Sequence, residues 1–439
     1  MLKQKRLTRK HYNSPFNMSV STSISAPVTR PGKLSRAWLT VALLCVVGCL
    51  NYLDRSMIST MRESVVRAIP MTEAQFGLQT SVFLWVYAFL SPLAGFLADK
   101  FARSKVIIGS LFVWSLVTLL TAHVQTYQQL LISRALMGIS EACYIPAALA
   151  LIVDYHRGPT RSTATGIHLA GIMVGQSLGF TGGMIAEKYA WTTAFTVFGL
   201  IGIVYAVVLI FFLRDAPKQE NFQQDAAPRV NFSEAIKLIF RKKSFILTLS
   251  YFSLLGIVGW MIMGWLPTYY REHFSLSQSL SGLYATAYVY PAALVGMIVG
   301  GFLADRWSKT NPKARVLLPV IGLLVAAPFV YAASNTDLLP VAIFCFMIFI
   351  FARSFSDANM MPVLCTFIDS RYLATAYGIL NLFACIVGGL GIYAAGILRD
   401  SKINLSIVFQ SASVIMVISA VLLYLVKPAK DLTVQTKPE

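Results

Sequence analysis

Charged residues are scarce in this chain. Of its 439 residues only 13% are Asp, Glu, Lys or Arg, whereas 56% are apolar. Soluble domains average about 25% charged residues, and a soluble protein of this length could not cover its surface with so little charge. A membrane-spanning helix needs roughly 20 mostly apolar residues. The composition therefore excludes an ordinary soluble domain and fits a lipid bilayer as the solvent.

Sequence motifs of soluble enzymes are missing as well. The chain has no Gly-x-Ser-x-Gly elbow, no Walker phosphate loop, no HExxH and no CxxC pair. Its six cysteines all lie in apolar runs, which indicates small buried residues rather than disulfides or metal ligands. We therefore expect a protein that is not an enzyme and that binds no metal or cofactor. Without a Walker loop, an ion gradient is a better candidate energy source than ATP.

Twelve long apolar runs make up most of the chain. We expect the fourth, tenth and eleventh to be tilted or bent because they are long. The runs lie near residues 38–60, 75–97, 106–123, 128–152, 163–186, 191–213, 245–269, 280–303, 315–333, 338–366, 372–398 and 404–426.

One long polar stretch, residues 214–244, divides these runs into two sets of six, and residues 231–236 within it have the pattern of a short amphipathic helix. The sequence predicts an all-α membrane protein of two pseudo-symmetric six-helix bundles, 38–213 and 245–426, joined by this linker. Residues 1–37 are expected to form a disordered basic tail, and residues 427–439 a second tail.

Acidic residues are half as frequent as basic ones, with 19 Asp and Glu against 37 Lys and Arg. Of the basic residues, 28 fall in the two tails, the linker and the turns after even-numbered runs, and six fall in the opposite loops. By the positive-inside rule the basic side is cytoplasmic, so both termini are expected there, in a bacterial inner membrane. We attribute the net charge of +18 to topology and anionic lipid rather than to nucleic-acid binding.

A five-residue phrase occurs twice. Gly95–Asp99 and Gly301–Asp305 both read Gly-Phe-Leu-Ala-Asp, 206 positions apart, and basic residues follow each copy. We expect each copy to form the turn between two apolar runs, with its Asp pairing with a basic residue at a neighbouring helix end to hold one conformation. The alternative is ordinary charge at a helix end. The predicted gating residues are Gly95, Asp99, Lys100, Arg103, Asp305 and Arg306.

Six charged residues lie inside the apolar runs, where each is costly unless paired or hydrated. They are Asp54, Arg55, Arg134, Glu141, Arg353 and Asp357. Arg353 and Asp357 are four residues apart and can pair directly, whereas the adjacent Asp54 and Arg55 point about 100° apart on a helix. Carboxylates in a poorly hydrated cavity can bind and release protons, and a guanidinium binds carboxylate or phosphate. The set predicts a proton-coupled site for an anion; the alternative is static ion pairs.

Four further groups are weaker candidates for the site. His168 lies within the fifth run and could relay protons or bind substrate, although a satisfied core histidine is commoner. Tyr87, Asn381 and the pair Trp265 and Tyr269 are candidate pocket residues. Aromatic residues near helix ends are also typical of interfacial anchors.

Over residues 38–426 the chain resembles the major facilitator superfamily. The Gly95–Lys105 segment matches the superfamily's signature turn, and Gly301–Lys309 matches it more weakly. Within the superfamily, Asn51-Tyr52-Leu53-Asp54-Arg55, Arg134-x-x-x-Gly138-x-x-Glu141-Ala142 and Trp265–Tyr269 are most similar to the anion:cation symporters, which carry sugar acids. The first two phrases are also similar to the spinster-like lysolipid carriers.

The resemblance to the symporters implies specific roles. Asp54 and Glu141 would be the protonatable pair, Arg55 would contact the substrate or switch partners with Asp54, and Arg134 would tune Glu141. Tyr87 and Asn381 would line the pocket. We therefore expect a monomeric, proton-coupled symporter of a small organic anion such as a sugar acid. The alternatives are a spinster-like carrier of an amphiphile and a membrane sensor that transports nothing.

Overall fold

The structure is a computed structural model that describes residues 31–156, 160–217 and 232–427. Within these ranges the regular structure is entirely helical. Twelve helical segments are long and apolar enough to cross a membrane, and they coincide with the predicted runs to within a few residues at most ends. The prediction of an all-α membrane protein with twelve spans is confirmed.

The first half of the chain contributes six spans. They are built from α1 (Pro31–Thr60), α3 (Glu73–Lys100), α4 (Arg103–Thr121), α5 (Tyr127–Glu141) with α6 (Tyr144–Tyr155), α7 (Arg161–Ser177) with α8 (Phe180–Lys188), and α9 (Trp191–Phe212); the short α2 (Arg62–Ala68) follows the first span.

The second half contributes the other six. They are α11 (Lys243–His273), α12 (Gln278–Thr286) with α13 (Val289–Ser308), α14 (Ala314–Asn335), α15 (Leu339–Cys365), α16 (Leu373–Asp400) and α17 (Leu405–Tyr424). A short helix, α10 (Phe232–Phe240), precedes them, and a 3₁₀ turn, η1 (Ser370–Tyr372), lies between α15 and α16.

Three spans are interrupted, and two of the interruptions have a proline four residues downstream. Proline has no N–H and cannot donate to the carbonyl four residues before it. Pro146 therefore leaves the carbonyl of Ala142 without its helical bond, and the fourth span breaks there, between α5 and α6. Pro291 acts in the same way on Ala287, where α12 gives way to α13. Of the three long spans that we expected to be tilted or bent, the fourth is broken, and the tenth and eleventh are each a single helix, α15 and α16.

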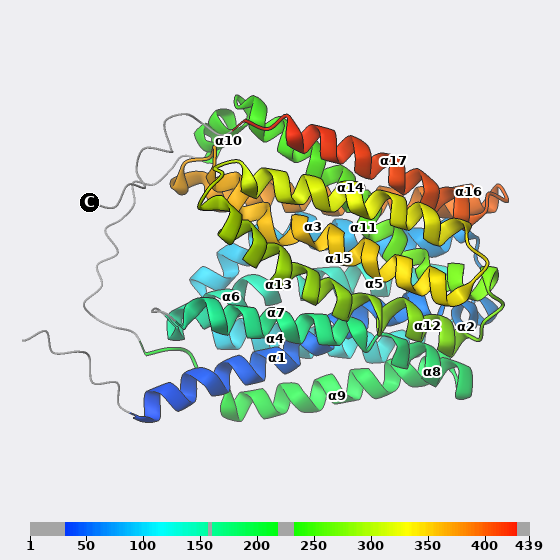
Figure 1. Cartoon of the computed structure of the whole chain (residues 1–439). Coiled ribbons are helices and arrows are strands. Elements are labelled where there is room, and N and C mark those ends of the chain that lie inside the picture. Colours follow the sequence, from blue (N-terminus) through cyan, green and yellow to red (C-terminus); the bar gives the residue numbers. More distant parts are fainter. Residues whose placement is uncertain (1–30, 157–159, 218–231, 428–439) are drawn as a thin grey trace, which may run out of the picture.

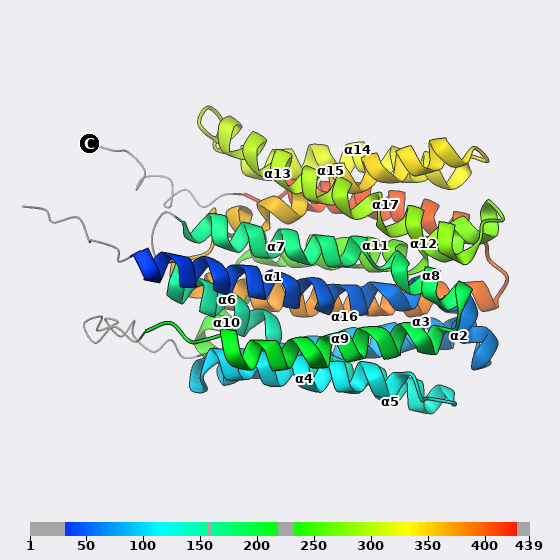
Figure 2. The same ribbon diagram turned by 90° about the horizontal axis from the view of Figure 1, so that it is seen from below.

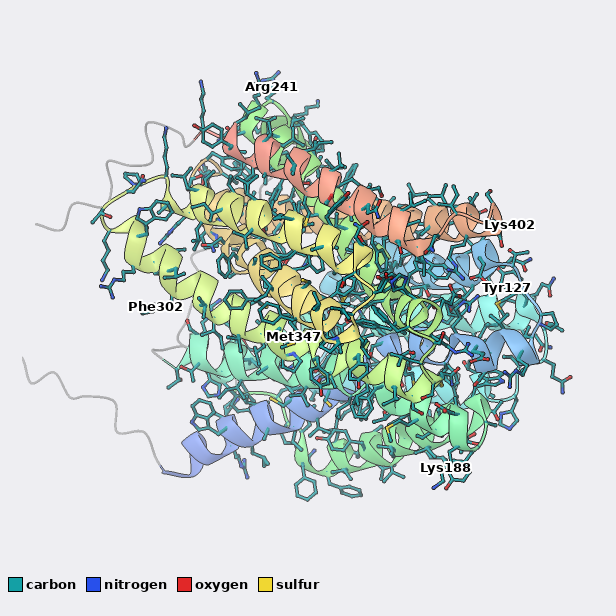
Figure 3. The ribbon with its side chains drawn as sticks, turned by 45° about the vertical axis from the view of Figure 1, so that its right-hand side comes forward. Tyr127, Lys188, Arg241, Phe302, Met347 and Lys402 are labelled. Carbon is teal, nitrogen blue, oxygen red and sulfur yellow. The ribbon has the colours of Figure 1, made fainter. Side chains whose placement is uncertain are left out.

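The two halves lie side by side with their helices roughly parallel to one long direction (Figure 1). We call the end where α1 begins and α17 ends the basic end, and the opposite end, with α2, α8 and α12, the distal end (Figures 1 and 2). The positive-inside prediction would make the basic end cytoplasmic. Large apolar side chains project outward between the two ends, as Phe302 of α13 does with 63% of its surface exposed (Figure 3).

The halves meet chiefly where α3 packs against α16 and where the fifth span packs against the eighth, through α8 with α12 and α7 with α13. The α3–α16 contact is close at the distal end, where a Cβ added to Gly396 would lie 2.4 Å from the Glu73 carbonyl oxygen. Its hydrogen bonds also lie in the distal half of α3, where the Ser81 hydroxyl donates to the Gly389 carbonyl at 2.7 Å. At the other end of these helices, Gly95 and Gly378 have no atom within 4 Å of an added Cβ. The halves are therefore joined most tightly at the distal end.

Two local expectations need correction. Residues 31–37 belong to α1, so the helix begins within the predicted tail; residues 1–30 lie outside the described residues. The repeated Gly-Phe-Leu-Ala-Asp phrases are not turns but the last turns of α3 and α13, because their apolar residues continue the helical pattern up to the membrane surface. The chain turns only after them.

Candidate functional site

A buried ion pair joins α1 to α5. The Arg55 Nε donates to Glu141 Oε2 at 2.6 Å, and the Arg55 and Glu141 side chains are 6% and 0% exposed. Glu141 is the last residue of α5, at the break beside Pro146. The rings of Tyr52 and Tyr87 lie 4.5 Å from the Arg55 guanidinium. Arg55 is thus held by one carboxylate and by aromatic faces that favour a cation.

Asp54 and Arg134, the other two charged residues within the spans of this half, are buried in different surroundings. Asp54 points away from Arg55, as a helix requires of adjacent residues, and its Oδ2 accepts from the Thr118 hydroxyl on α4 at 3.1 Å. Arg134 is fully buried beside Phe83, and its Nη1 lies 3.1 Å from the Met137 sulfur. Among the described residues, its Nε and Nη2 have no hydrogen-bond partner. A buried guanidinium in this state is costly, so a change in the charge of the neighbouring carboxylates would alter its energy strongly.

The second half holds an ion pair of its own on α15. Arg353 Nη1 and Asp357 Oδ2 are 2.8 Å apart, as the spacing of four residues predicts. The partly exposed pair lies at the wall of a cavity of about 230 Å³. A Cβ added to Gly259 of α11 would lie 2.8 Å from Arg353 Nη2, so the glycine makes room for the guanidinium.

The cavity lies at the junction of the halves but belongs mainly to the second. Helix α7 contributes Met173 and Gln176, and the second half contributes the remaining residues. Most of the lining is apolar, and the predicted residue Asn381 is among the polar exceptions. The other lining residues are Phe252, Leu255, Gly256, Gly259, Trp260, Met263, Tyr290, Ala293, Met297, Ile350, Arg353, Ser354, Asp357, Ala384 and Cys385.

The predicted site residues thus fall into two groups. Asp54, Arg55, Arg134 and Glu141 are packed inside the first half, and Tyr87 covers Arg55 there. Arg353, Asp357 and Asn381 line the cavity. These assignments to the site stay predictions, but the geometry separates the buried carboxylates of the first half from the cavity wall of the second.

His168 is placed elsewhere. Its side chain is fully buried, with the ring of Tyr144 5.9 Å away, and a Cβ added to Gly48 would lie 3.1 Å from its ring. It is therefore packed between α1, α6 and α7 rather than on the cavity wall. Trp265 and Tyr269 lie toward the distal end, where their side chains donate to the carbonyls of Ile392 and Ala333.

Two of the predicted gating residues, Arg103 and Asp305, form ion pairs within their own halves. Arg103 at the start of α4 binds Asp154 at the end of α6. Asp305 lies 3.6 Å from Arg315 at the start of α14, in an exposed pair. Lys100 lies over the rings of Phe96 and Phe101, and Arg306 is exposed. The side chain of Asp99 lies outside what the structure describes. The Asp305 pair joins two helices of one half, and its gating role stays a prediction.

Two features of the structure are absent from the sequence-based predictions. The apolar cavity residues Met173, Trp260 and Met297 occur in runs that are apolar throughout, so no local signal distinguishes them. The distal end carries ion pairs between the halves, formed by residues that we counted only as loop charges. A signal was present, since acids and arginines cluster at the distal ends of the first, second, seventh and eleventh spans.

Two six-helix halves, with charges buried inside the first and a cavity at their junction, are typical of a membrane transporter. The family model of the Major Facilitator Superfamily matches residues 44–392. The chain belongs to the Major Facilitator Superfamily.

Among individual proteins, the chain is similar to protein spinster homolog 1 of Xenopus laevis, with 28% identity over 332 residues, covering 71% of this chain and 63% of that protein. It is also similar to an MFS-type efflux pump of Mycolicibacterium smegmatis, with 26% identity over 373 residues, covering 83% and 85%. The matched region spans only 52% of the length of Drosophila melanogaster protein spinster.

Two solved structures share the fold. Both are crystal structures of a bacterial homolog of the human lysosomal transporter spinster, in inward-facing occupied and unoccupied conformations. The first has a TM-score of 0.75 at 21% identity and covers 89% of this chain and 96% of that one. The second has a TM-score of 0.73 at 22% identity and covers 91% and 96%.

Proposed function

We propose that the protein is a proton-coupled secondary transporter of an amphiphile with a charged head group. The observation that carries this proposal is the cavity, which combines a mainly apolar wall with a single ion pair. A sugar acid would place several hydroxyl groups against that apolar wall without hydrogen-bond partners, which is unfavourable. An amphiphile can place its head at Arg353 and Asp357 and its chain against the flexible methionines, which adapt to irregular apolar shapes.

The cavity is too small to enclose a long amphiphile completely. Pockets that surround a drug-sized ligand measure roughly 300–1,000 Å³, and this cavity measures about 230 Å³. One wall is formed where α7 meets α13 through Met173 and Met297. Near the basic end of the same two helices, Gly166 and Gly301 have no atom within 4 Å of an added Cβ. We propose that the chain of the substrate extends along this junction.

Proton coupling is assigned to Asp54 and Glu141. When Glu141 takes up a proton, its ion pair with Arg55 is lost, and α1 loses its charged link to α5. Helix α1 also contacts α11 and α12 of the second half. Protonation can therefore alter how the halves pack, and the aromatic rings around Arg55 keep its charge tolerable while it changes partner.

A binding series tests the substrate class. The protein in lipid nanodiscs would be heated with lysophospholipids of one head group and increasing chain length, with the head group alone, and with hexuronate and galactonate. We expect thermal stabilisation that increases with chain length, because ligand that binds the folded state stabilises it by mass action. Trp260→Ala should reduce this stabilisation, whereas Phe302→Ala, on the outer surface, should not.

Arg353 at the cavity wall also supports a second candidate, transport of a small organic anion. Stabilisation by a sugar acid but by no lysophospholipid would favour it and overturn the amphiphile proposal. Coupling is tested separately in proteoliposomes loaded with the ligand that binds. Accumulation that is the same with and without a proton gradient would remove the proton from the proposal.

A further inference from the structure

A cluster of charges closes the distal end between the halves. Arg399, near the end of α16, binds both Glu272 carboxylate oxygens, at 2.9 and 2.7 Å, and its Nε donates to Glu73 Oε2 of α3 at 3.2 Å. Its guanidinium lies 5.2 Å from the buried ring of Trp265. Glu272 belongs to the same half as Arg399, whereas Glu73 belongs to the other, so one arginine has a partner in each half.

The next residue makes a second connection. The Asp400 carboxylate accepts hydrogen bonds from the backbone N–H groups of Glu73 and Ala74 at 2.8 and 3.0 Å. A residue of the second half therefore caps the first turn of a helix of the first half, where the helix dipole favours negative charge. Arg271 of α11 adds an ion pair with Glu63 of α2.

The carboxylates of the cluster that face arginines across the junction also have arginines in their own halves. Glu73 binds Arg62, Glu63 binds Arg67 at 2.7 Å, and Glu272 keeps Arg399. If the halves separated here, each of these carboxylates would retain an ion pair. Removing one partner of an enclosed pair is strongly unfavourable, so these replacement partners lower the cost of opening. The Asp400 cap would be lost on opening.

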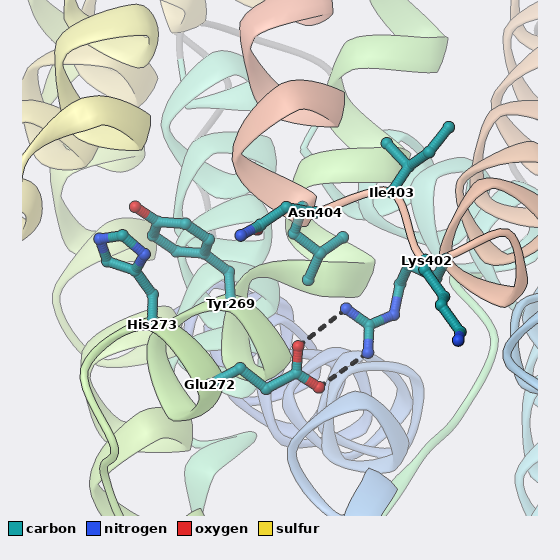
Figure 4. Close-up of a pocket in the computed structure, with 8 residues that line it drawn as sticks. Tyr269, Glu272, His273, Lys402, Ile403 and Asn404 are labelled. Carbon is teal, nitrogen blue, oxygen red and sulfur yellow. Dashed lines mark hydrogen bonds and ion pairs between the residues drawn. The ribbon is translucent and has the colours of Figure 1, made fainter.

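One side of the cluster is open at the protein surface. A surface hollow of about 420 Å³ is lined by Glu272, Arg399, His273 and Lys402, among others, and exposes the Glu272–Arg399 pair (Figure 4). The Arg399–Glu73 pair is more enclosed, with the two side chains 10% and 22% exposed. The Arg399–Glu272 pair within one half is thus more exposed than the Arg399–Glu73 pair between the halves.

We propose that this cluster is a reversible distal gate with replacement partners built in. Contacts between the halves, above all the Asp400 cap, hold the gate shut. Pairs within each half, above all Arg62 with Glu73, stabilise the charges once it is open. The proposal holds for whichever substrate the protein carries. It predicts effects of opposite sign: removing a contact between the halves opens the gate, and removing a replacement partner closes it. Arg62 also lies 3.9 Å from Glu272 of the other half, at the distance limit of an ion pair. This contact between the halves is minor, because Arg399 makes two hydrogen bonds to the same carboxylate.

Spin labels on the two halves can measure the gate in the full chain. Lys188 and Lys402 are exposed at the distal end, on the first and second half (Figure 3). With the six native cysteines replaced by alanine, both would be changed to cysteine and labelled, and double electron–electron resonance would give the ratio of long to short distances in nanodiscs. Asp400→Asn should raise that ratio about tenfold, the scale of one charged hydrogen bond. Arg62→Gln should lower it about threefold, the scale of a partly exposed ion pair.

Two further variants keep the test decisive. Asp337→Asn is the matched control, because Asp337 is an exposed distal acid that lies 3.4 Å from His273 of its own half; it should leave the ratio unchanged. If the labelled protein shows only the short distance, Arg62→Gln is added to Asp400→Asn and should bring the ratio back down. The proposal would be overturned if Arg62→Gln raised the ratio of long to short distances, either alone or combined with Asp400→Asn. It would also be overturned if Asp400→Asn changed that ratio no more than Asp337→Asn does.

Discussion

Replacing Glu141 by glutamine is the most informative single change. The substitution keeps the shape of the side chain but removes the charge that faces Arg55 at 2.6 Å. Removing one partner of a fully buried ion pair costs about 3–5 kcal/mol. Here the amide oxygen can still accept from the Arg55 Nε, and a hydrogen bond to a charged group contributes about 1.5–3 kcal/mol. We therefore expect a net loss of about 2 kcal/mol in the free energy of unfolding.

Transport and stability should respond differently to this change. A glutamine cannot release a proton, so gradient-driven accumulation in proteoliposomes should be lost, whereas exchange of labelled for unlabelled substrate should persist. The melting temperature should fall. Adding Arg55→Met should recover part of that fall, because no uncompensated charge then remains in the first half at this position.

The double-mutant cycle provides the refutation. Residues in contact show interaction free energies of about 0.5–3 kcal/mol, and independent residues add. Losses that simply add for Arg55→Met and Glu141→Gln would show that the two side chains are not paired in the membrane. Accumulation at the normal rate with glutamine at this position would show that this carboxylate is structural. If Asp54→Asn also accumulated substrate normally, the proton site would have to be sought at Asp357 or His168.

Further substitutions test the other parts of the site. Asp54→Asn should also abolish accumulation but should cost only about 1 kcal/mol, because it alters one hydrogen bond; a large fall in melting temperature would contradict this. Arg353→Lys should weaken ligand binding in the thermal series about tenfold, since an ammonium cannot reproduce the guanidinium fork; unchanged binding would remove Arg353 from the site. Gly396→Ala should force α16 from α3 and lengthen the distal spin-label distance, because its Cβ would lie 2.4 Å from a carbonyl oxygen. Gly378→Ala, on the same helix and with no atom within 4 Å, should leave that distance unchanged and serves as its control.

The sequence alone determined the membrane-spanning architecture. A bilayer supplies no hydrogen-bond partners, so each span must satisfy its own backbone as a helix, and the run of apolar residues that this requires is a local property of the chain. The six charges within the spans were visible for the same reason, because a charge in an apolar run stands out. The pairing of Arg353 with Asp357 also followed from sequence, since residues four apart share one helix face.

Only the tertiary structure decided which charges meet across helices. Arg55 pairs with Glu141, 86 residues away, while its neighbour Asp54 turns to Thr118. Sequence shows that two adjacent residues diverge on a helix, but not which helix each one faces. The apolar cavity and the distal cluster of Glu73, Arg399 and Asp400 were hidden for the same physical reason: they depend on how complete helices are rotated and placed against one another, and that arrangement is set by packing over the whole length of each helix rather than by any local pattern.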